Sequence, residues 1–472
     1  MNRRKVISFG MAAVMTAGML AGCGGTGTTA TSSASGSTSS ASKAGSYENA
    51  KVEINGMVAE DTDLTGEFTY WSAFTGDSQT WDQSRVDLFN ELYADKGIKC
   101  NVQFVPDGAG VNNGKLLSAI AGGTGPDVFI SDNPTSVYTY ATNGSLEDLS
   151  EPLDKVGINL DDFFPGCKDV IYYKDTPYLI PQDANVIMLY YNPDIATEVG
   201  LDPDTPPTTL EELDQWADAM TKVDADGNYE RFGLIPWLDS GNDAFVVPYI
   251  MGCDPYDAAA NKLDLTSDTM VNYLEWVQSY AQKYNPEKIQ SFTSGLGGMF
   301  SPDHAFMRGK VGMTITGNWF SNALKIYAPD VNYKVCAVPV PEGGRANSTT
   351  FGVNVFGIPT GAKNAELATL FIKFCLSSQV NDDNFKQWRS IPTSDAAFDD
   401  VSLTKEGDEM YALEREIANS PENGIPALCS VSAELSTSFQ AFRESVIYSN
   451  ADIKAGLQEL QDKFQKQLDA EN

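Results

Sequence analysis

Short segments with strand character alternate with amphipathic segments along most of this chain. Residues 98–104 alternate between apolar and polar side chains, which is the period of a half-buried strand. A helix carrying Leu116, Leu117 and Ile120 follows, and after a glycine-rich turn comes a short buried strand over residues 127–130. Because this strand–helix–strand order repeats, the sequence predicts an α/β fold with a largely parallel sheet.

The later segments keep this order and supply their own helix boundaries. Thr209 and Glu212 have the spacing of a capping box, which predicts a helix directly after them. A short helix is expected after Ser301-Pro302, and a strand that includes Val311 and Ile315 is expected after it. Further amphipathic helices are expected over residues 267–284, 365–376 and 453–468.

Size and charge narrow the possible partners. Residues 47–472 are too many for one typical domain and suit two or three. The net charge is -32, with 64 acidic residues against 32 lysines and arginines. A surface this acidic repels phosphate backbones, so nucleic acid is not expected as a partner.

The N-terminus has the features of an export signal. A basic start precedes an apolar run over residues 6–20, which is too short to span a bilayer, and small residues lead to Cys23. This arrangement resembles a bacterial lipoprotein signal. We therefore expect residues 1–22 to be a signal peptide and Cys23 to carry lipid, with residues 23–60 serving as a flexible Gly/Ser/Thr linker. Removal of three basic residues would leave a charge of -35, and the body would lie at the outer face of the cell membrane.

Catalytic and metal-binding signatures are scarce. His304 is the only histidine, and it is accompanied by no Gly-x-Ser-x-Gly motif, phosphate-binding loop or Cys-x-x-Cys pair. The segment 224–228 has acidic residues at alternate positions, but a tight turn explains it better than a calcium loop. An exported protein permits disulfides among the six cysteines other than Cys23, but Cys100 and Cys375 fall on apolar positions of predicted elements, which favours buried thiols. We expect no catalytic residue, no metal and no cofactor.

Five stretches of the chain resemble one known family. These are residues 68–71, 115–128, 177–181 with 188–192, 306–313 with 317–319, and 352–354 followed by the helix at 365–376. Together, and in this order, they are similar to the extracellular solute-binding proteins that serve ABC sugar importers, the maltodextrin-binding class.

The resemblance implies an α/β, two-lobed, periplasmic-binding-protein-like fold of type II with a central ligand cleft. It implies chain crossings between the lobes near 181–184, 312–316 and 351–354. On this basis we expect an N-terminal lobe formed by residues 61–182 plus 314–351. The C-terminal lobe would then comprise residues 183–313 plus 352–472. Such a protein captures a sugar or oligosaccharide by lobe closure, acts as a monomer and delivers its ligand to a membrane permease without covalent chemistry.

Sugars present hydroxyl groups and apolar ring faces, so their sites combine aromatic planes with polar side chains. Candidates are residues of these types that follow predicted strands or lie at the implied crossings. They are Trp71, Phe74, Asp132, Asn133, Gln182, Asp183, Trp237, Asn318, Trp319, Trp388 and Arg389. Core packing is the alternative for each tryptophan, and helix capping is the alternative for Asp132.

Other functions stay open at this point. A binding protein for a peptide or amino acid would have the same architecture, although no basic cluster indicates an anion site. A secreted carbohydrate hydrolase would release product over time, whereas a receptor would return its ligand unchanged. A structural surface lipoprotein would bind no ligand saturably.

Overall fold

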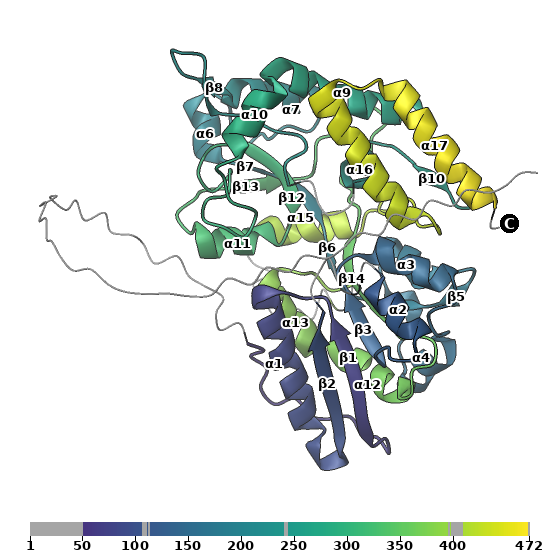
Figure 1. Cartoon of the computed structure of the whole chain (residues 1–472). Helices are drawn as coiled ribbons and strands as arrows, with labels where there is room; N and C mark the ends of the chain where they lie inside the picture. The colour runs from purple at the N-terminus through teal and green to yellow at the C-terminus, as the bar shows by residue number, and fades with distance from the viewer. Residues whose placement is uncertain are drawn as a thin grey trace, which may run out of the picture. The chain divides into compact units, whose positions relative to one another are not determined.

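The computed structural model describes residues 51–105, 111, 114–239, 244–394, 397 and 409–470. A five-stranded sheet lies in one lobe, here called the first lobe (Figure 1). Its order is β2 (Ile98–Phe104), β1 (Gly66–Ser72), β3 (Val128–Ser131), β14 (Gly352–Gly357) and β6 (Leu179–Asn185). The first three strands are parallel, and β14 runs antiparallel to both of its neighbours. The predicted α/β sheet is thus mixed rather than wholly parallel.

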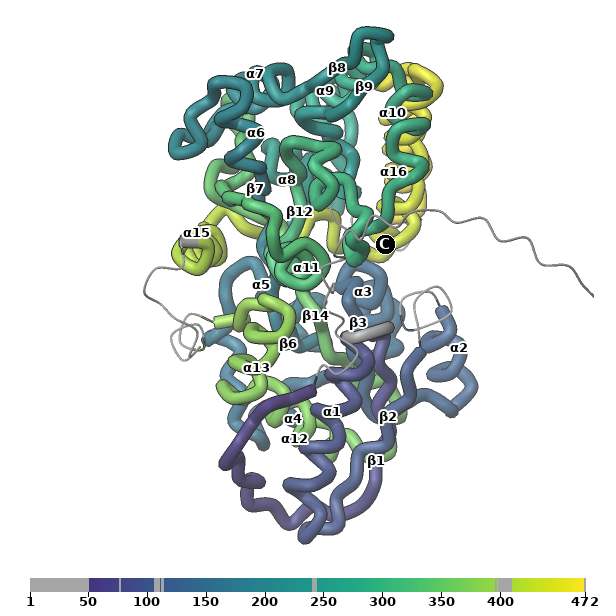
Figure 2. The backbone as a smooth tube through the Cα atoms, turned by 90° about the vertical axis from the view of Figure 1, so that its left-hand side faces the viewer, coloured from purple at the N-terminus to yellow at the C-terminus, as the bar shows by residue number. Residues whose placement is uncertain are grey.

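Helices surround this sheet because its central strands are apolar on both faces. Every residue of β3 is buried, and β1 is buried from Tyr70 onward. Phe68 of β1 packs between Phe89 and Phe371, with ring centroids 5.8 and 5.7 Å away. Helices α1 and α12, which carry these two rings, lie beside β2 and β1 respectively (Figure 2). The helices of this lobe are α1 (Gly76–Leu92), α2 (Lys115–Ala121), α3 (Pro134–Thr142), α4 (Ser150–Val156), α5 (Pro165–Ile171), α12 (Ala365–Cys375) and α13 (Ser378–Trp388), with the 3-10 turns Ala94–Lys96 and Leu160–Asp162 and the short strands β4 (Tyr172–Tyr173) and β5 (Thr176–Pro177).

The second lobe is built on an antiparallel three-stranded sheet in the order β12 (Met313–Gly317), β7 (Ile187–Tyr191) and β13 (Lys334–Cys336). The capping box is confirmed, because the Thr209 hydroxyl accepts from the Glu212 N–H while the Glu212 carboxylate accepts from the Thr209 N–H. The helices are α6 (Pro193–Glu198), α7 (Leu210–Met220), α8 (Val246–Ile250), α9 (Asp268–Tyr284), α10 (Pro286–Thr293), α11 (Phe320–Tyr327), α16 (Ser432–Ser449) and α17 (Ile453–Asp469), with the hairpins β8 (Lys222–Val223) to β9 (Tyr229–Arg231) and β10 (Tyr256–Asp257) to β11 (Lys262–Leu263). Helix α15 (Glu409–Ala418) precedes α16.

Within the residues that the structure describes, the chain passes between the lobes three times. Strand β6 runs into β7 with Val186 alone between them, and β14 enters the first sheet at Gly352. The third passage follows α13, where Ile391 and Ala184 exchange two backbone hydrogen bonds of 2.8 Å. The first and second passages lie at or close to the crossings expected near 181–184 and 351–354.

The crossing expected near 312–316 is wrong. All five residues of β12 pair with β7, and the preceding Gly312 and Met313 donate to backbone carbonyls of Phe232 and Gly233 in the same lobe. The expected lobe bounds are wrong for the same reason. Strands β12 and β13, within 314–351, lie in the second sheet, whereas β14 and α12, within 352–472, belong to the first lobe.

Other expectations have mixed outcomes. Residues 224–228 do form the turn of the β8–β9 hairpin, with Gly227 at a φ of 82°. The short helix expected after Ser301-Pro302 is instead a series of turns. Cys100, Cys167, Cys253, Cys375 and Cys429 are buried free thiols, and Cys336 is a half-buried one. Within the described residues, no helix has the length and apolar character needed to cross a membrane. The predicted signal peptide, Cys23 and the linker up to residue 50 lie outside the described residues.

Candidate functional site

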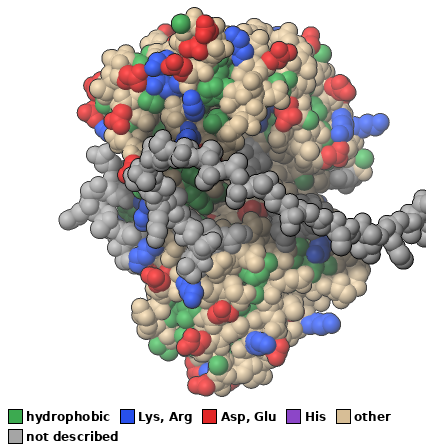
Figure 3. All heavy atoms as spheres, turned by 60° about the vertical axis from the view of Figure 1, so that its left-hand side comes forward, with side chains coloured by type: hydrophobic (Ala, Val, Ile, Leu, Met, Phe, Trp, Pro, Cys, Tyr) green, Lys and Arg blue, Asp and Glu red, His purple; other side chains and the backbone are tan. Residues whose placement is uncertain are grey.

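A cavity of about 810 Å³ is lined by residues of both lobes. The space-filling view shows hydrophobic and acidic side chains in the hollow where the lobes meet (Figure 3). The first lobe contributes the start of α1, the turn from β3 to α3, and β14. The second lobe contributes segments after β9 and β12, the segment before Ser301, and one face of α16. Its aromatic lining residues are Phe74, Trp81, Trp237, Phe300, Trp319, Tyr327, Phe351 and Trp388, and its polar ones include Asp132, Asn133, Asn185, Asp239, Asn322, Asn354, Asn384, Gln440 and Arg443.

The aromatic side chains of the second lobe present ring surface to the cavity. The Trp319 indole N–H donates to the sulfur of Met299 at 2.8 Å, so the polar edge of this ring is already engaged. Phe300, beside Met299, is 58% exposed. Such rings offer flat apolar surfaces on which a ligand with apolar faces can stack.

At the first-lobe wall, Asp132 and Asn133 follow β3. Asn133 is the N-cap of α3, because its side chain accepts from the Ser136 N–H at 3.0 Å and Pro134 starts the helix. Asn133, and not Asp132, therefore caps α3, so the alternative role considered for Asp132 is wrong. Both residues line the cavity.

Gln182 and Asp183 do not line the cavity but form a buried network with residues of the first lobe. The Asp183 carboxylate accepts from Asn354 and Asn384, each at 2.8 Å, and from Gln182 at 3.1 Å. Gln182 in turn accepts from the Arg85 guanidinium at 2.6 Å. Asn354 and Asn384 line the cavity, so the network holds two of the cavity's amide groups in place.

Burial dominates the electrostatics of this network. It raises the pKa of Asp183 to about 6, although hydrogen bonds from Asn384 and Asn354 and the nearby charge of Arg85 act to lower it. Arg85 is completely buried, forms an ion pair with Asp82 and lies over the Trp81 ring at 4.9 Å. Trp81 itself donates to Asp383 at 2.7 Å.

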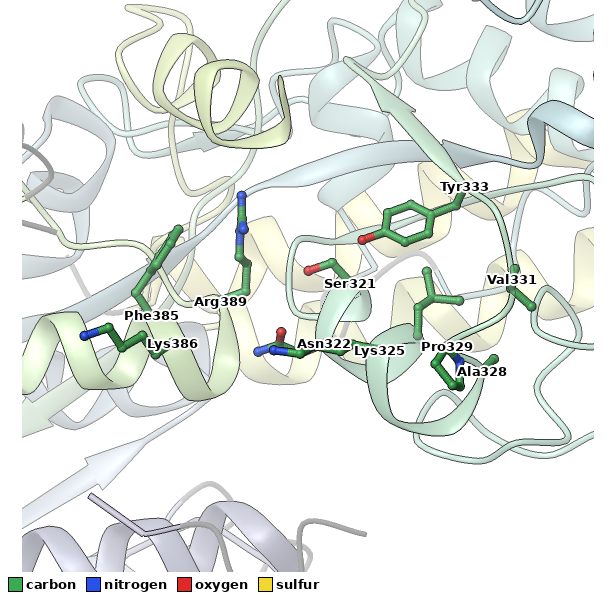
Figure 4. Close-up of a pocket in the computed structure, with 11 residues that line it drawn as sticks. Ser321, Asn322, Lys325, Ala328, Pro329, Val331, Tyr333, Phe385, Lys386 and Arg389 are labelled. Carbon is green, nitrogen blue, oxygen red and sulfur yellow. The ribbon is translucent and has the colours of Figure 1, made fainter. Parts of the chain in front are cut away.

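Arg389 and Asn318 also serve the structure rather than the cavity lining. The Arg389 guanidinium forms a bidentate ion pair with the buried Glu414, with nitrogen–oxygen distances of 2.8 to 3.1 Å. The Asn318 side chain donates to the Arg389 carbonyl and accepts from the Val186 N–H. Arg389 borders a smaller cavity of about 350 Å³, where it and Phe385 face Ser321 and Asn322 of α11 (Figure 4).

Six of the eleven predicted site residues therefore line the large cavity: Phe74, Asp132, Asn133, Trp237, Trp319 and Trp388. The other five do not. Trp71 is buried in β1 because the strand continues to Ser72, and its ring contacts Lys115. Gln182, Asp183, Asn318 and Arg389 are held in the contacts described above.

Sequence reasoning missed Trp81, Asp239, Phe300, Gln440 and Arg443. Asp239 comes two residues after Trp237 and could have been proposed with it. Phe300 follows a glycine-rich segment that has no regular period. Gln440 and Arg443 lie on α16, where nothing in the sequence separates a cavity face from a solvent face.

Two α/β lobes joined by three chain passages, with a cavity lined from both, define the type II periplasmic binding fold. The chain belongs to the family of bacterial extracellular solute-binding proteins, whose family model matches residues 75–382. It is similar to the galactooligosaccharide-binding protein of Bacillus subtilis, with 25% identity over 74% of this chain and 79% of that protein. It is similar also to the arabinooligosaccharide-binding protein of Halalkalibacterium halodurans, with 24% identity over 69% of this chain and 71% of that one.

Among solved structures, CpMnBP1 with mannotriose bound superimposes with a TM-score of 0.74 and 27% identity, covering 84% of this chain and 99% of that one. These relatives and the family are binding proteins rather than enzymes.

Proposed function

We propose that this protein captures a sugar or oligosaccharide in the cavity between its lobes and delivers it to the permease of an ABC importer. The observation that carries the proposal is the composition of the cavity wall. Eight aromatic side chains share it with carboxylates and amides, and the volume of about 810 Å³ falls in the range of small-molecule sites. Aromatic faces suit the apolar faces of sugar rings, and the polar groups suit hydroxyls.

The relatives support this ligand class. The names of the two curated relatives give oligosaccharides as their ligands, and the solved structure holds mannotriose. The cavity walls belong to two lobes, so a ligand that touches both walls favours the closed arrangement by its differential affinity. The closed form is what the permease would recognise.

We further propose that the protein performs no catalysis and carries no metal or cofactor. In the described part of the chain, no group of three or more His, Cys, Asp or Glu side chains is arranged to hold a metal ion. Asp132 and Asp239 both line the cavity, and a hydrolase would need a pair of carboxylates of this kind. Incubation of the protein with the ligand, followed by chromatography of the sugar, tests this alternative, and release of shorter sugars would overturn the proposal.

Residues 1–60 carry the proposed location. The basic and apolar segments before Cys23 support removal of residues 1–22 and lipidation of Cys23, with residues 23–60 as the linker. The monomeric protein would then be held at the outer face of the cell membrane, within reach of the permease.

A thermal-shift panel tests the ligand class. The purified protein is mixed with mannobiose, mannotriose, galactooligosaccharides, arabinooligosaccharides and maltooligosaccharides, and with amino acids and short peptides for contrast. A ligand at 100 times its Kd should add about 2.7 kcal/mol to the free energy of unfolding. Stabilisation by a carbohydrate supports the proposal, whereas stabilisation by a peptide or amino acid alone would contradict it.

A further inference from the structure

Asp239 is a carboxylate held at the cavity wall in an uncommon backbone conformation. It lines the cavity two residues after Trp237, and its side chain is 13% exposed. Its φ is 61°, in the left-handed region that residues other than glycine seldom occupy. Such conformations persist only where surrounding contacts impose them, and they concentrate at functional sites.

Two buried donors hold one oxygen of this carboxylate. The Asp239 Oδ2 atom lies 2.8 Å from Nε2 of His304 and accepts from the Thr314 hydroxyl at 3.2 Å. Thr314 belongs to β12, where every residue is buried. The two donors thus come from a strand and from the turns that precede it, and both approach Asp239 from the interior.

The local contacts of His304 determine which of its nitrogens carries the proton. The imidazole is 2% exposed and packs against the Phe320 ring at 4.9 Å. Its Nδ1 atom accepts from the backbone N–H of Phe306 at 3.3 Å. In the neutral ring the proton must then be on Nε2, which donates it to Asp239. The only histidine of the chain is therefore committed to orienting this carboxylate.

The carboxylate of Asp239 lies at the cavity wall with one oxygen engaged by these two donors. Both hydrogen bonds that Asp239 receives from described residues go to Oδ2. The carboxylate itself lines the cavity, and 13% of the Asp239 side-chain surface is exposed. An oriented carboxylate at a cavity wall is an acceptor for a hydroxyl, and it would repel a negatively charged ligand group.

We propose that Asp239 is a ligand-binding residue that accepts a hydrogen bond from a hydroxyl of an uncharged sugar unit, and that His304 and Thr314 are positioning residues that hold it. This inference rests on the proposed function, because it assumes a hydroxyl-bearing ligand. Trp237, two residues before Asp239, also lines the cavity and offers a ring face on which the same sugar unit can stack.

Titration calorimetry with mannotriose and galactooligosaccharides as probes tests the carboxylate. The Asp239→Asn amide can keep its oxygen toward His304 and Thr314 only by turning its NH₂ group to the cavity, which replaces an acceptor by a donor. Loss of a hydrogen bond to a charged group predicts binding about 10- to 100-fold weaker than in the wild type. Wild-type affinity in Asp239→Asn, with the probe still bound by the wild type, would overturn the inference.

The positioning role needs variants that separate it from stability. His304→Gln retains an N–H donor near the position of Nε2, whereas His304→Phe retains a ring against Phe320 and removes the donor. We expect affinity close to wild type for His304→Gln and a loss of about 10-fold for His304→Phe. In the double variant with Asp239→Asn, the loss from His304→Phe should largely disappear, because its effect passes through the carboxylate.

Equal losses in both histidine variants, or fully additive losses in the double variant, would contradict the positioning role. Thermal unfolding without ligand shows whether each variant is folded, and Thr314→Val provides a second donor deletion if His304→Phe does not fold. Failure of the proposed function has a different signature, because then the wild type itself binds no carbohydrate.

Discussion

The burial of Asp183, at the first passage between the lobes, makes the stability of the protein depend on pH. Its carboxyl group is buried and accepts three side-chain hydrogen bonds. Burial raises its pKa to about 6 from an ordinary value of 3.8. The folded state therefore binds the proton more tightly than the unfolded state. The contribution of Asp183 to stability is present at low pH and declines as the pH rises through the interval between the two values.

The substitution Asp183→Asn removes this titration. As the pH rises from about 4 to about 6, the free energy of unfolding of the wild type should fall relative to that of the variant, by about 3 kcal/mol at most. Urea denaturation at half-unit steps of pH measures the difference. Asp169, whose pKa burial also raises to about 6, is present in both proteins and cancels. A difference that stays constant between pH 4 and 7 would refute the assignment.

Phe300 offers a test of the aromatic wall that leaves folding nearly untouched. Because its ring is largely exposed at the cavity, Phe300→Ala should change the unfolding temperature little. Loss of one stacking surface should weaken binding of mannotriose about 3- to 10-fold by calorimetry. Tyr448→Ala, which removes an exposed ring that does not line the cavity, is the matched control and should bind as the wild type does. Equal affinity in the two variants would count against a role for Phe300.

At the residue scale, the sequence predicted cavity residues correctly where a side chain lies within two residues of a strand end, as at Phe74, Asp132 and Trp319. The prediction did not hold at Trp71, because β1 extends one residue further than the sequence indicated. It also did not hold where a polar side chain pairs with a buried side chain that is distant in the sequence. Gln182 pairs with Arg85, and Arg389 pairs with Glu414. Such pairs depend on the folded path of the chain, which local spacing does not reveal.

At the scale of the elements, the start of α7 allows the contribution of a helix cap to stability to be measured. The Thr209 hydroxyl and the Glu212 carboxylate satisfy the backbone N–H groups at its start. Thr209→Ala should lower the free energy of unfolding by about 1 kcal/mol, while Thr209→Ser, which keeps the hydroxyl, should cost only a fraction of that. Denaturant unfolding measures both variants. Equal stability of Thr209→Ala and Thr209→Ser would show that the cap contributes little, and binding of mannotriose should be unchanged in either.

Element type was more predictable than element partnership. The alternation over residues 98–104, the capping box and the amphipathic C-terminal helix all appear where the sequence indicated. Strands β12 and β14 are both short and both combine apolar with polar residues, so their sequences do not distinguish the two sheets. Pairing of β12 with β7 and of β14 with β3 is decided by contacts across more than 100 residues, such as Met313 opposite Tyr191.

For the molecule as a whole, lipidation of Cys23 is directly testable in cells. Metabolic labelling with an alkyne fatty acid should mark the wild-type protein and leave Cys23→Ser unlabelled, because the thiol is the attachment atom. Cys336→Ser is the matched control, since Cys336 is the half-buried cysteine of the folded body, and it should be labelled as the wild type is. Labelling of Cys23→Ser would contradict the proposed anchor.

The three passages between the lobes have a mechanical consequence for uptake. Two lobes joined by a single flexible segment could adopt many relative orientations, and only some of these would close on a ligand. Three passages restrict the relative orientations that the lobes can adopt. The first and third passages are also joined to each other by the backbone hydrogen bonds between Ala184 and Ile391. The two halves of the binding site are therefore held close to each other before any solute binds. A solute bound to one wall then meets the other at high effective concentration, which favours rapid capture from dilute solution.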